Sequence, residues 1–327
     1  MDQKTYIVGH RGFPPVAPQN TLSSFRAAIA AGADGVETDV QLTKDGEMVI
    51  HHDYSIDTTS NGHGRIDTMT FEEVRGYDFG IRRGEQFKGE KIPTFTEFLD
   101  TVQGMQVINV ELKAPTDRSI PFVSRVVDEV VRRNLLDRAL ISAFDHSLLA
   151  QVKELCPQLR VGCLTFEPGM AQSPDMQLLA KAIPMDKKLA DITEEDVIVP
   201  EGLSIEALLG PENAGTGKHD PRQRILELVH AQGAIFVGCS AGELISTVEA
   251  QRDLAAYAES LPFKPDFMHM NYKHLLEIPE TVANLREMGI GSSPWTVDEP
   301  EVMRICLDLG CWSIITNRTD LLLEMMG

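Results

Sequence analysis

The stretch GADGVETDVQLTKDG at residues 32–46 contains the pattern on which the fold prediction depends. Residues 36–42 are typical of a β-strand, and an amphipathic helical segment at residues 21–31 precedes them. Residues two apart in a strand point the same way, so Glu37 and Asp39 share one face. Two carboxylates on an inward face would repel each other and resist desolvation unless a cation lay between them. The stretch therefore predicts both a helix–strand unit and a candidate cation site.

Strand-like and helix-like segments alternate along most of the chain on both sides of this stretch. The expected strands are residues 6–9, 36–42, 48–52, 107–112, 139–144, 161–166, 267–270, 290–295 and 313–316, and the further helices are residues 94–102, 122–134, 147–155, 280–288, 299–309 and 320–326. Repeated strand–helix units predict parallel strands joined by right-handed crossovers, and about eight of them favour a closed barrel over an open sheet. We therefore expect residues 1–327 to form a single α/β domain, a TIM (β/α)8 barrel.

Two segments interrupt this alternation. Residues 54–91 are polar and glycine-rich, and they stand where a strand-to-helix loop is expected. A barrel places such loops on its C-terminal face, so we expect this small insertion to cap the active site. Residues 170–264 form a larger irregular insertion around the fifth and sixth units. Within it, residues 197–199 and 234–237 are the alternatives for a barrel strand.

The composition restricts the classes of partner. With 30 basic and 49 acidic residues the formal net charge is −19, which argues against binding nucleic acid or anionic membrane surfaces. No run of about 18 apolar residues occurs, so no membrane span is expected. The five cysteines are odd in number and lack CxxC spacing, which favours reduced thiols. Because the first residues lack the pattern of a secretory signal, we expect a cytoplasmic location.

Candidate catalytic and ligating residues stand on predicted strands or just beyond them. His10 and Arg11 follow the first strand, and His52 ends the segment at residues 48–52. Glu111 shares a strand face with Lys113, which repeats the spacing of the first carboxylate pair. Barrel enzymes build their active sites at such strand ends. Carboxylates from two strands suit Mg²⁺ or Ca²⁺ better than zinc, which prefers histidine and cysteine. The candidate site therefore comprises His10, Glu37, Asp39, His52 and Glu111.

A series of motifs adds a family resemblance to this reading. The motifs are HRG at 10–12, PQNT at 18–21, GADGVETDVQLTKDG at 32–46, VIHHD at 49–53, NGHGRI at 61–66, IPTFTEFL at 92–99, NVELK at 109–113, ISAF at 141–144 and PWTV at 294–297. Together they resemble the glycerophosphodiester phosphodiesterase family over residues 6–166 and 266–320. The resemblance implies a TIM barrel in which residues 54–91 are the capping insertion.

The resemblance also implies a role for each matching position. His10 and His52, rather than the adjacent His51, would be the general acid and base. Arg11 and Lys113 would bind the non-bridging phosphate oxygens. The remaining implied site residues are the metal ligands Glu37, Asp39 and Glu111, for Mg²⁺ or Ca²⁺, and Trp295 at the alcohol-binding end of the pocket.

Three positions depart from the family pattern. Gln19 stands where the family usually has glutamate, Thr58 where arginine is frequent, and Asn317 where aspartate commonly follows the last strand. None of them removes a proposed metal ligand or catalytic histidine. We interpret them as a signal of substrate specificity or of a subfamily.

The function that the resemblance implies is metal-dependent hydrolysis of small glycerophosphodiesters to an alcohol and glycerol phosphate. The attacking oxygen is either water or the glycerol 2-hydroxyl of the substrate. One alternative is a phospholipase D-like hydrolase of lysolipid or sphingolipid phosphodiesters, whose apolar channel residues 170–264 would build. Another is a non-catalytic barrel that binds metal and phosphate, which Gln19 and Asn317 permit and the two retained histidines argue against.

Overall fold

The computed structural model divides the chain into two compact units. The first consists of Met1–Glu167 with Asp253–Gly327, and the second of Pro168–Arg252. The residues that the structure describes are 4–200, 222–223, 225–226, 229 and 239–327.

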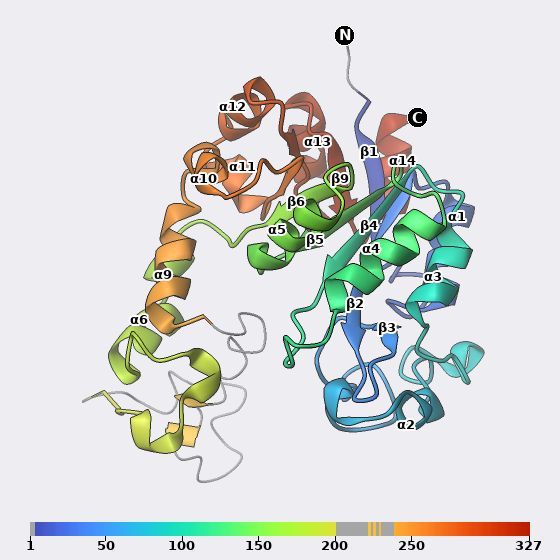
Figure 1. Cartoon of the computed structure of the whole chain (residues 1–327). Coiled ribbons are helices and arrows are strands. Elements are labelled where there is room, and N and C mark those ends of the chain that lie inside the picture. Colours follow the sequence, from blue (N-terminus) through green and yellow to red (C-terminus); the bar gives the residue numbers. More distant parts are fainter. Residues whose placement is uncertain (1–3, 201–221, 224, 227–228, 230–238) are drawn as a thin grey trace. The chain divides into compact units, whose positions relative to one another are not determined.

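The first unit contains a parallel barrel (Figure 1). Its strands are β1 (Tyr6–His10), β2 (Gly35–Leu42), β4 (Val107–Leu112), β5 (Ala139–Ala143), β6 (Arg160–Leu164), β7 (Phe267–His269), β8 (Gly291–Ser292) and β9 (Ser313–Thr316). They pair in the order β8-β7-β6-β5-β4-β2-β1-β9. Two backbone hydrogen bonds join the ends of this order, from Trp312 N to Ser292 O at 2.9 Å and from Ile315 N to Pro294 O at 3.0 Å. The predicted TIM barrel is confirmed.

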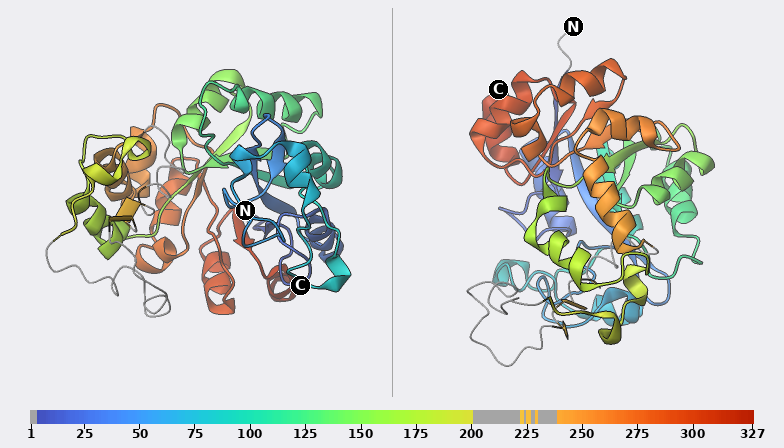
Figure 2. Two further views of the ribbon diagram at one scale, coloured as in Figure 1. Left: turned by 90° about the horizontal axis from the view of Figure 1, so that it is seen from below. Right: turned by 90° about the vertical axis from the view of Figure 1, so that its left-hand side faces the viewer.

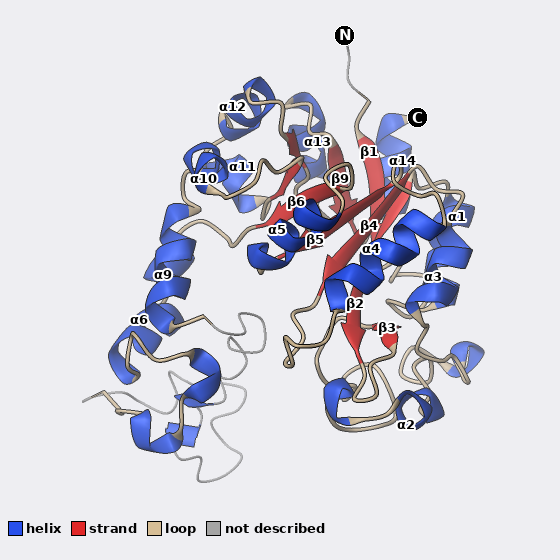
Figure 3. Ribbon diagram, in the orientation of Figure 1, coloured by secondary structure: helices blue, strands red, loops and turns tan. Residues whose placement is uncertain are grey.

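Apart from the short helices within residues 54–91, the helices of this unit lie outside its strands (Figure 3), and the two further views in Figure 2 agree. They are α1 (Leu22–Ala31), α3 (Phe95–Val102), α4 (Phe122–Arg132), α5 (His146–Leu155), α10 (Leu254–Ser260), α11 (Lys273–Glu277), α12 (Thr281–Glu287), α13 (Pro300–Asp308) and α14 (Thr319–Met326). Helix α4 shows why they pack there, since its buried residues Phe122, Val126 and Val130 recur at the spacing of one helical face. Helix α3 begins with a capping box, in which Thr94 and Glu97 bond reciprocally.

The segment expected as a strand at residues 48–52 differs from the prediction. It forms β3 (Met48–Ile50), which pairs antiparallel with β2 and takes no part in the parallel order of the barrel. The cause is the short turn between the two strands, where Gly46 has a φ of 82°. A parallel connection needs a crossover of a dozen or more residues, whereas a short turn reverses the chain. His52 therefore lies beyond the strand, in the loop that follows it.

Residues 54–91 pack around a hydrophobic cluster of their own. The segment contains the short helices η1 (Ile66–Thr68), α2 (Phe71–Gly76) and η2 (Glu85–Phe87). Its buried apolar side chains pack with two residues that flank the segment, Val49 and Ile92. Together they form the cluster Val49, Ile56, Ile66, Val74, Phe79 and Ile92. This small core fixes the loop against β3.

The second unit follows β6, the fifth barrel strand. It contains η3 (Met170–Gln172), α6 (Pro174–Ala182), η4 (Leu189–Asp191), η5 (Glu194–Asp196) and α9 (Ala241–Ala250). Residues 197–199, one alternative for a barrel strand, are not a strand, and residues 234–237 lie outside the described part of the chain. After α9, Asp253 caps the separate helix α10. No helix within the described residues is long and apolar enough to cross a membrane.

A buried histidine makes the stability of the barrel depend on pH. His146 lies at the start of α5, where its Nε2 is 3.0 Å from the carbonyl oxygen of Leu164 and its Nδ1 is 2.7 Å from the hydroxyl of Tyr257. Burial lowers the pKa of His146 from 6.5 to about 4. The unfolded chain therefore binds this proton more readily than the folded protein between these two pH values.

We expect stability to fall as the pH drops from about 6.5 towards 4, with a contribution from His146 on the order of 3 kcal/mol. His146→Gln should lessen this dependence, because glutamine carries the donor and acceptor but does not titrate. The measurement is the midpoint of thermal unfolding as a function of pH. His63→Gln is the matched control, since the His63 side chain is 80% exposed. An equal pH slope in the wild type and in His146→Gln would contradict the prediction.

Candidate active site

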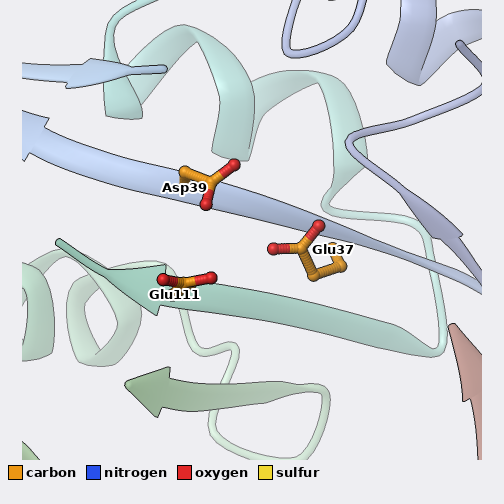
Figure 4. Close-up of side chains that lie close together, drawn as sticks. All are labelled: Glu37, Asp39 and Glu111. Atoms are coloured by element: carbon orange, nitrogen blue, oxygen red, sulfur yellow. The ribbon is translucent and has the colours of Figure 1, made fainter. Parts of the chain in front are cut away.

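Three carboxyl groups meet on two neighbouring strands of the barrel. Glu37 and Asp39 belong to β2, and Glu111 belongs to β4, where it lies in register with Asp39. Oxygen atoms of the three side chains all lie within 4.8 Å of one another, and Figure 4 shows the groups side by side. The residues are buried, with exposed fractions of 5%, 0% and 7%. The alternation of β2 thus directs Glu37 and Asp39 to the same side, as strand geometry predicts.

Burial and mutual repulsion change how this carboxylate cluster holds its charge. Burial, together with the charges of Asp39 and Glu111, raises the pKa of Glu37 well above its usual range. Burial also acts to raise the pKa of Asp39, but Lys113, His52 and Arg11 outweigh it and hold that pKa well below its usual range. All the donor atoms of the cluster are carboxylate oxygens, which are the ligands that Mg²⁺ and Ca²⁺ prefer. The cluster therefore fits a hard divalent cation, whose charge would replace the missing compensation.

Two cationic side chains adjoin the cluster. The Nζ atom of Lys113 lies 2.5 Å from Glu111 Oε1 and 2.9 Å from Asp39 Oδ1. These carboxylates raise the pKa of Lys113 despite its burial, which alone would lower it. Arg11 follows β1 with a φ of 54°, and its backbone N–H donates to Glu37 Oε2 at 3.1 Å. Its guanidinium donates to Gln19 Oε1 at 2.8 Å and lies 3.6 Å from Asp39.

Asn20 is a part of the site that the sequence analysis did not single out. Its Nδ2 donates to Asp39 Oδ2 at 2.7 Å, and its Oδ1 accepts from the Thr38 hydroxyl at 2.9 Å. The residue is buried and has a φ of 56°. Asparagine tolerates this left-handed conformation better than most residues. The available signal was its place within the motif at residues 18–21, which was used only for the family resemblance.

The two histidines predicted to act in catalysis are held by different partners. His10 ends β1, with its Nδ1 2.9 Å from Asn317 Oδ1 and its Nε2 4.0 Å from Glu37 Oε2. Burial and the nearby Arg11 lower the pKa of His10 to about 3, against weaker opposing effects. His52 contacts Asp53 Oδ1 through Nδ1 at 2.7 Å, and this contact holds the pKa of Asp53 well below its usual range.

His51 and the three residues that depart from the family pattern also have hydrogen-bond partners. His51 is buried and bonds through Nδ1 to the backbone oxygen of Asp53 and through Nε2 to the Thr59 hydroxyl, at 2.8 and 2.6 Å. Thr58 donates to Asp53 Oδ2 at 2.8 Å, so it supports the partner of His52. Gln19 and Asn317 are the partners of Arg11 and His10 described above.

A cavity of about 80 Å³ gathers most of the predicted site residues. Trp295 forms part of its wall, where the indole donates to the His269 carbonyl oxygen at 2.7 Å and meets the Phe144 ring edge-on. Asp39 and Lys113 do not line the cavity, but Lys113 contacts both Asp39 and the lining residue Glu111. The lining residues are His10, Arg11, Glu37, His52, Asn109, Glu111, Ser142, Phe144, Leu164, Trp295, Thr296 and Ile315.

Comparison with known proteins identifies the family. The model of the glycerophosphoryl diester phosphodiesterase family matches residues 10–237 and 241–321. A glycerophosphodiester phosphodiesterase of Caldanaerobacter subterraneus is 37% identical over 180 residues, which are 55% of this chain and 74% of the relative. One from Bacillus altitudinis is 35% identical over 198 residues, covering 59% of this chain and 80% of the relative.

Solved structures agree in fold. A phosphodiesterase of Oleispira antarctica, in complex with the product sn-glycerol-3-phosphate, superposes with a TM-score of 0.63 at 18% identity, over 98% of this chain and 96% of the other. A glycerophosphodiester phosphodiesterase of Agrobacterium tumefaciens gives a TM-score of 0.62 at 19% identity, over 98% and 100%. With the match to the family model, these findings show that the chain belongs to the glycerophosphoryl diester phosphodiesterase family of phosphoric diester hydrolases.

Proposed function

We propose that this enzyme hydrolyses glycerophosphodiesters to an alcohol and glycerol phosphate in a metal-dependent reaction in which His10 and His52 transfer protons. The observation that carries the proposal is that both histidines line one cavity together with Glu37 and Glu111 of the buried carboxylate cluster. The glycerol phosphate found in the Oleispira antarctica enzyme is the product expected of such a reaction.

In this proposal Glu37, Asp39 and Glu111 hold Mg²⁺ or Ca²⁺. A divalent cation at these carboxylates supplies charge stabilisation for the phosphate and for the negative charge that develops on its oxygens. Asn20 supports the cluster by holding Asp39 Oδ2, and the Arg11 backbone N–H does the same for Glu37. Such supporting hydrogen bonds orient ligating carboxylates and strengthen metal binding.

In the same proposal Arg11 and Lys113 bind the non-bridging phosphate oxygens. The buried Nε of Arg11 has no hydrogen-bond partner among the described residues. A buried donor without a partner is costly, so a site of this kind favours a ligand that supplies an acceptor. Lys113 has three donors, of which the contacts to Glu111 and Asp39 use two. Trp295 and Phe144 give the cavity an apolar wall that suits the alcohol end of a substrate.

The histidines account for the proton transfers. One removes a proton from the attacking oxygen, and the other protonates the departing alcohol oxygen, which together contribute about 10²–10⁴-fold to the rate. The attacking oxygen is water or the glycerol 2-hydroxyl, and detection of a cyclic phosphate intermediate distinguishes them. We further propose that residues 54–91 cap this site and that residues 170–264 are an insertion between β6 and β7. We also propose a cytoplasmic location, which is supported by five cysteines that form no disulfide within the described residues.

Replacement of either histidine tests the proposed chemistry. His10→Ala and His52→Ala should each lower kcat on glycerophosphocholine by about 10²-fold or more, because the proton transfer loses its donor or acceptor. Hydrolysis is followed as release of glycerol phosphate. His63→Ala is the control, because this histidine lies within residues 54–91 and is largely exposed. Wild-type activity in a folded His10→Ala or His52→Ala variant would remove that residue from the mechanism.

The carboxylate cluster predicts that the effect of Glu37→Gln on thermal stability differs with and without a divalent cation. In the presence of a chelator, the Glu37→Gln variant should unfold at the same temperature as the wild type or at a higher one. The substitution removes a carboxyl group that Asp39 and Glu111 repel. With Mg²⁺ or Ca²⁺ in excess, the unfolding temperature of the wild type should rise by several degrees. A cation concentration of about 100 times the Kd stabilises the folded protein by ~2.7 kcal/mol. The variant should gain much less.

Differential scanning calorimetry with and without each cation measures both effects. Glu85→Gln, at a side chain that is 78% exposed, should respond to the cations like the wild type. An equal gain in Glu37→Gln, or no gain in the wild type with either cation, would argue against the proposed metal site.

A further inference from the structure

A carboxylate outside the cavity reaches His10 through an amide. Hydrogen bonds from Val297 N to Ile315 O at 3.0 Å and from Ile315 N to Pro294 O at 3.0 Å hold the chain after β8 alongside β9. This pairing brings Asp298 next to Asn317, the residue that follows β9. The Asn317 side chain then lies between Asp298 on one side and His10 on the other.

The contacts of Asp298 fix which way the Asn317 amide faces. Asp298 Oδ2 lies 2.8 Å from the side-chain nitrogen of Asn317, and Oδ1 accepts from the Asn317 backbone N–H at 2.8 Å and from the Thr316 hydroxyl at 3.1 Å. An ionised carboxylate only accepts hydrogen bonds, so the group beside Asp298 must be the NH₂ of the amide. The amide oxygen of Asn317 is consequently the atom that faces His10.

The orientation of the amide in turn fixes the proton on the imidazole. His10 Nδ1 lies 2.9 Å from Asn317 Oδ1, which has no hydrogen to donate. Nδ1 must therefore carry the proton of this hydrogen bond. A neutral imidazole has only one N–H, so its Nε2 has a free lone pair. This nitrogen is the one on the side of Glu37, at 4.0 Å from Oε2.

We propose that Asp298 and Asn317 are positioning residues that keep the His10 proton on Nδ1 and present Nε2 to the substrate. Proton exchange with the reacting oxygens then takes place at Nε2 alone. The inference rests on the proposed function for the role of His10, whereas the tautomer itself follows from the hydrogen bonds. A purely structural role of Asp298, in bonding the turn before α14, would not require any particular tautomer of His10.

The position of the proton can be observed directly. In protein labelled with ¹⁵N-histidine, at neutral pH, we expect a protonated Nδ1 and an unprotonated, downfield Nε2 for His10. His10→Gln assigns the signals by removing them. A protonated Nε2 in the wild type would overturn the proposal, whether or not the protein hydrolyses a phosphodiester.

A pair of substitutions separates positioning from folding. Asp298→Asn lets the Asn317 amide turn around, so the His10 signals should shift towards the other tautomer. We expect kcat to fall on the order of 10²-fold, with KM near the wild-type value, because substrate contacts are unchanged. The exchanged pair Asp298→Asn with Asn317→Asp restores an acceptor to His10 and a donor to residue 317. It should regain the Nδ1–H tautomer, and its kcat should be at least about tenfold higher than that of Asp298→Asn.

Glu299→Gln is the matched control, because it removes the adjacent exposed carboxylate, which makes no side-chain capping bond to α13. It should keep both the tautomer and kcat. If Asp298→Asn does not fold, the wild-type spectrum and the exchanged pair still test the proposal. A folded exchanged pair without recovery of the tautomer, or a folded Asp298→Asn with the wild-type tautomer and kcat, would overturn the proposal. An inactive wild type with the expected tautomer would instead overturn the proposed function.

Discussion

The burial of three carboxylates on adjacent parallel strands is the constraint around which the site is organised. The register that places Asp39 opposite Glu111 brings negative charges together where water is excluded. Such a cluster is unfavourable unless it is compensated. Lys113 compensates part of it by ion pairs, and Asn20 and the Arg11 backbone donate hydrogen bonds. Burial and the negative charge that remains keep the pKa of Glu37 high, and a divalent cation is the simplest group that would compensate this charge.

The two histidines face the same cavity but are supported by different chemistry. His52 has a carboxylate behind it, Asp53, which Thr58 holds in place. His10 has a neutral amide behind it, and the carboxylate of Asp298 acts only through that amide. A carboxylate can only accept a hydrogen bond, whereas an amide offers both an acceptor and a donor. The surroundings of the two rings are thus unequal, which supports the proposal that one ring donates a proton and the other accepts one.

The three residues that depart from the family pattern have similar positions in the structure. Gln19 accepts a hydrogen bond from Arg11, Thr58 donates to Asp53, and Asn317 contacts His10. Each is a neutral side chain one contact away from a residue of the proposed site or from its partner. The charges of the ligands and of the groups proposed to act are unchanged, and only their neighbours differ. This pattern fits tuning of the site better than loss of its chemistry.

The sequence alone determined the barrel, because repeated strand–helix units appear as local periodicity. Strand positions and the family resemblance together predicted six of the twelve residues that line the cavity. Strand alternation specifies that Glu37 and Asp39 share a face, and repeated strand–helix units specify parallel pairing. Tertiary structure decided what local patterns do not contain. The antiparallel pairing of β3 follows from a turn too short for a crossover, and Asn20 bonds Asp39 from a loop. Asp298 reaches His10 only because barrel closure sets residues some 300 positions apart in the chain side by side, and no periodicity along the sequence encodes that contact.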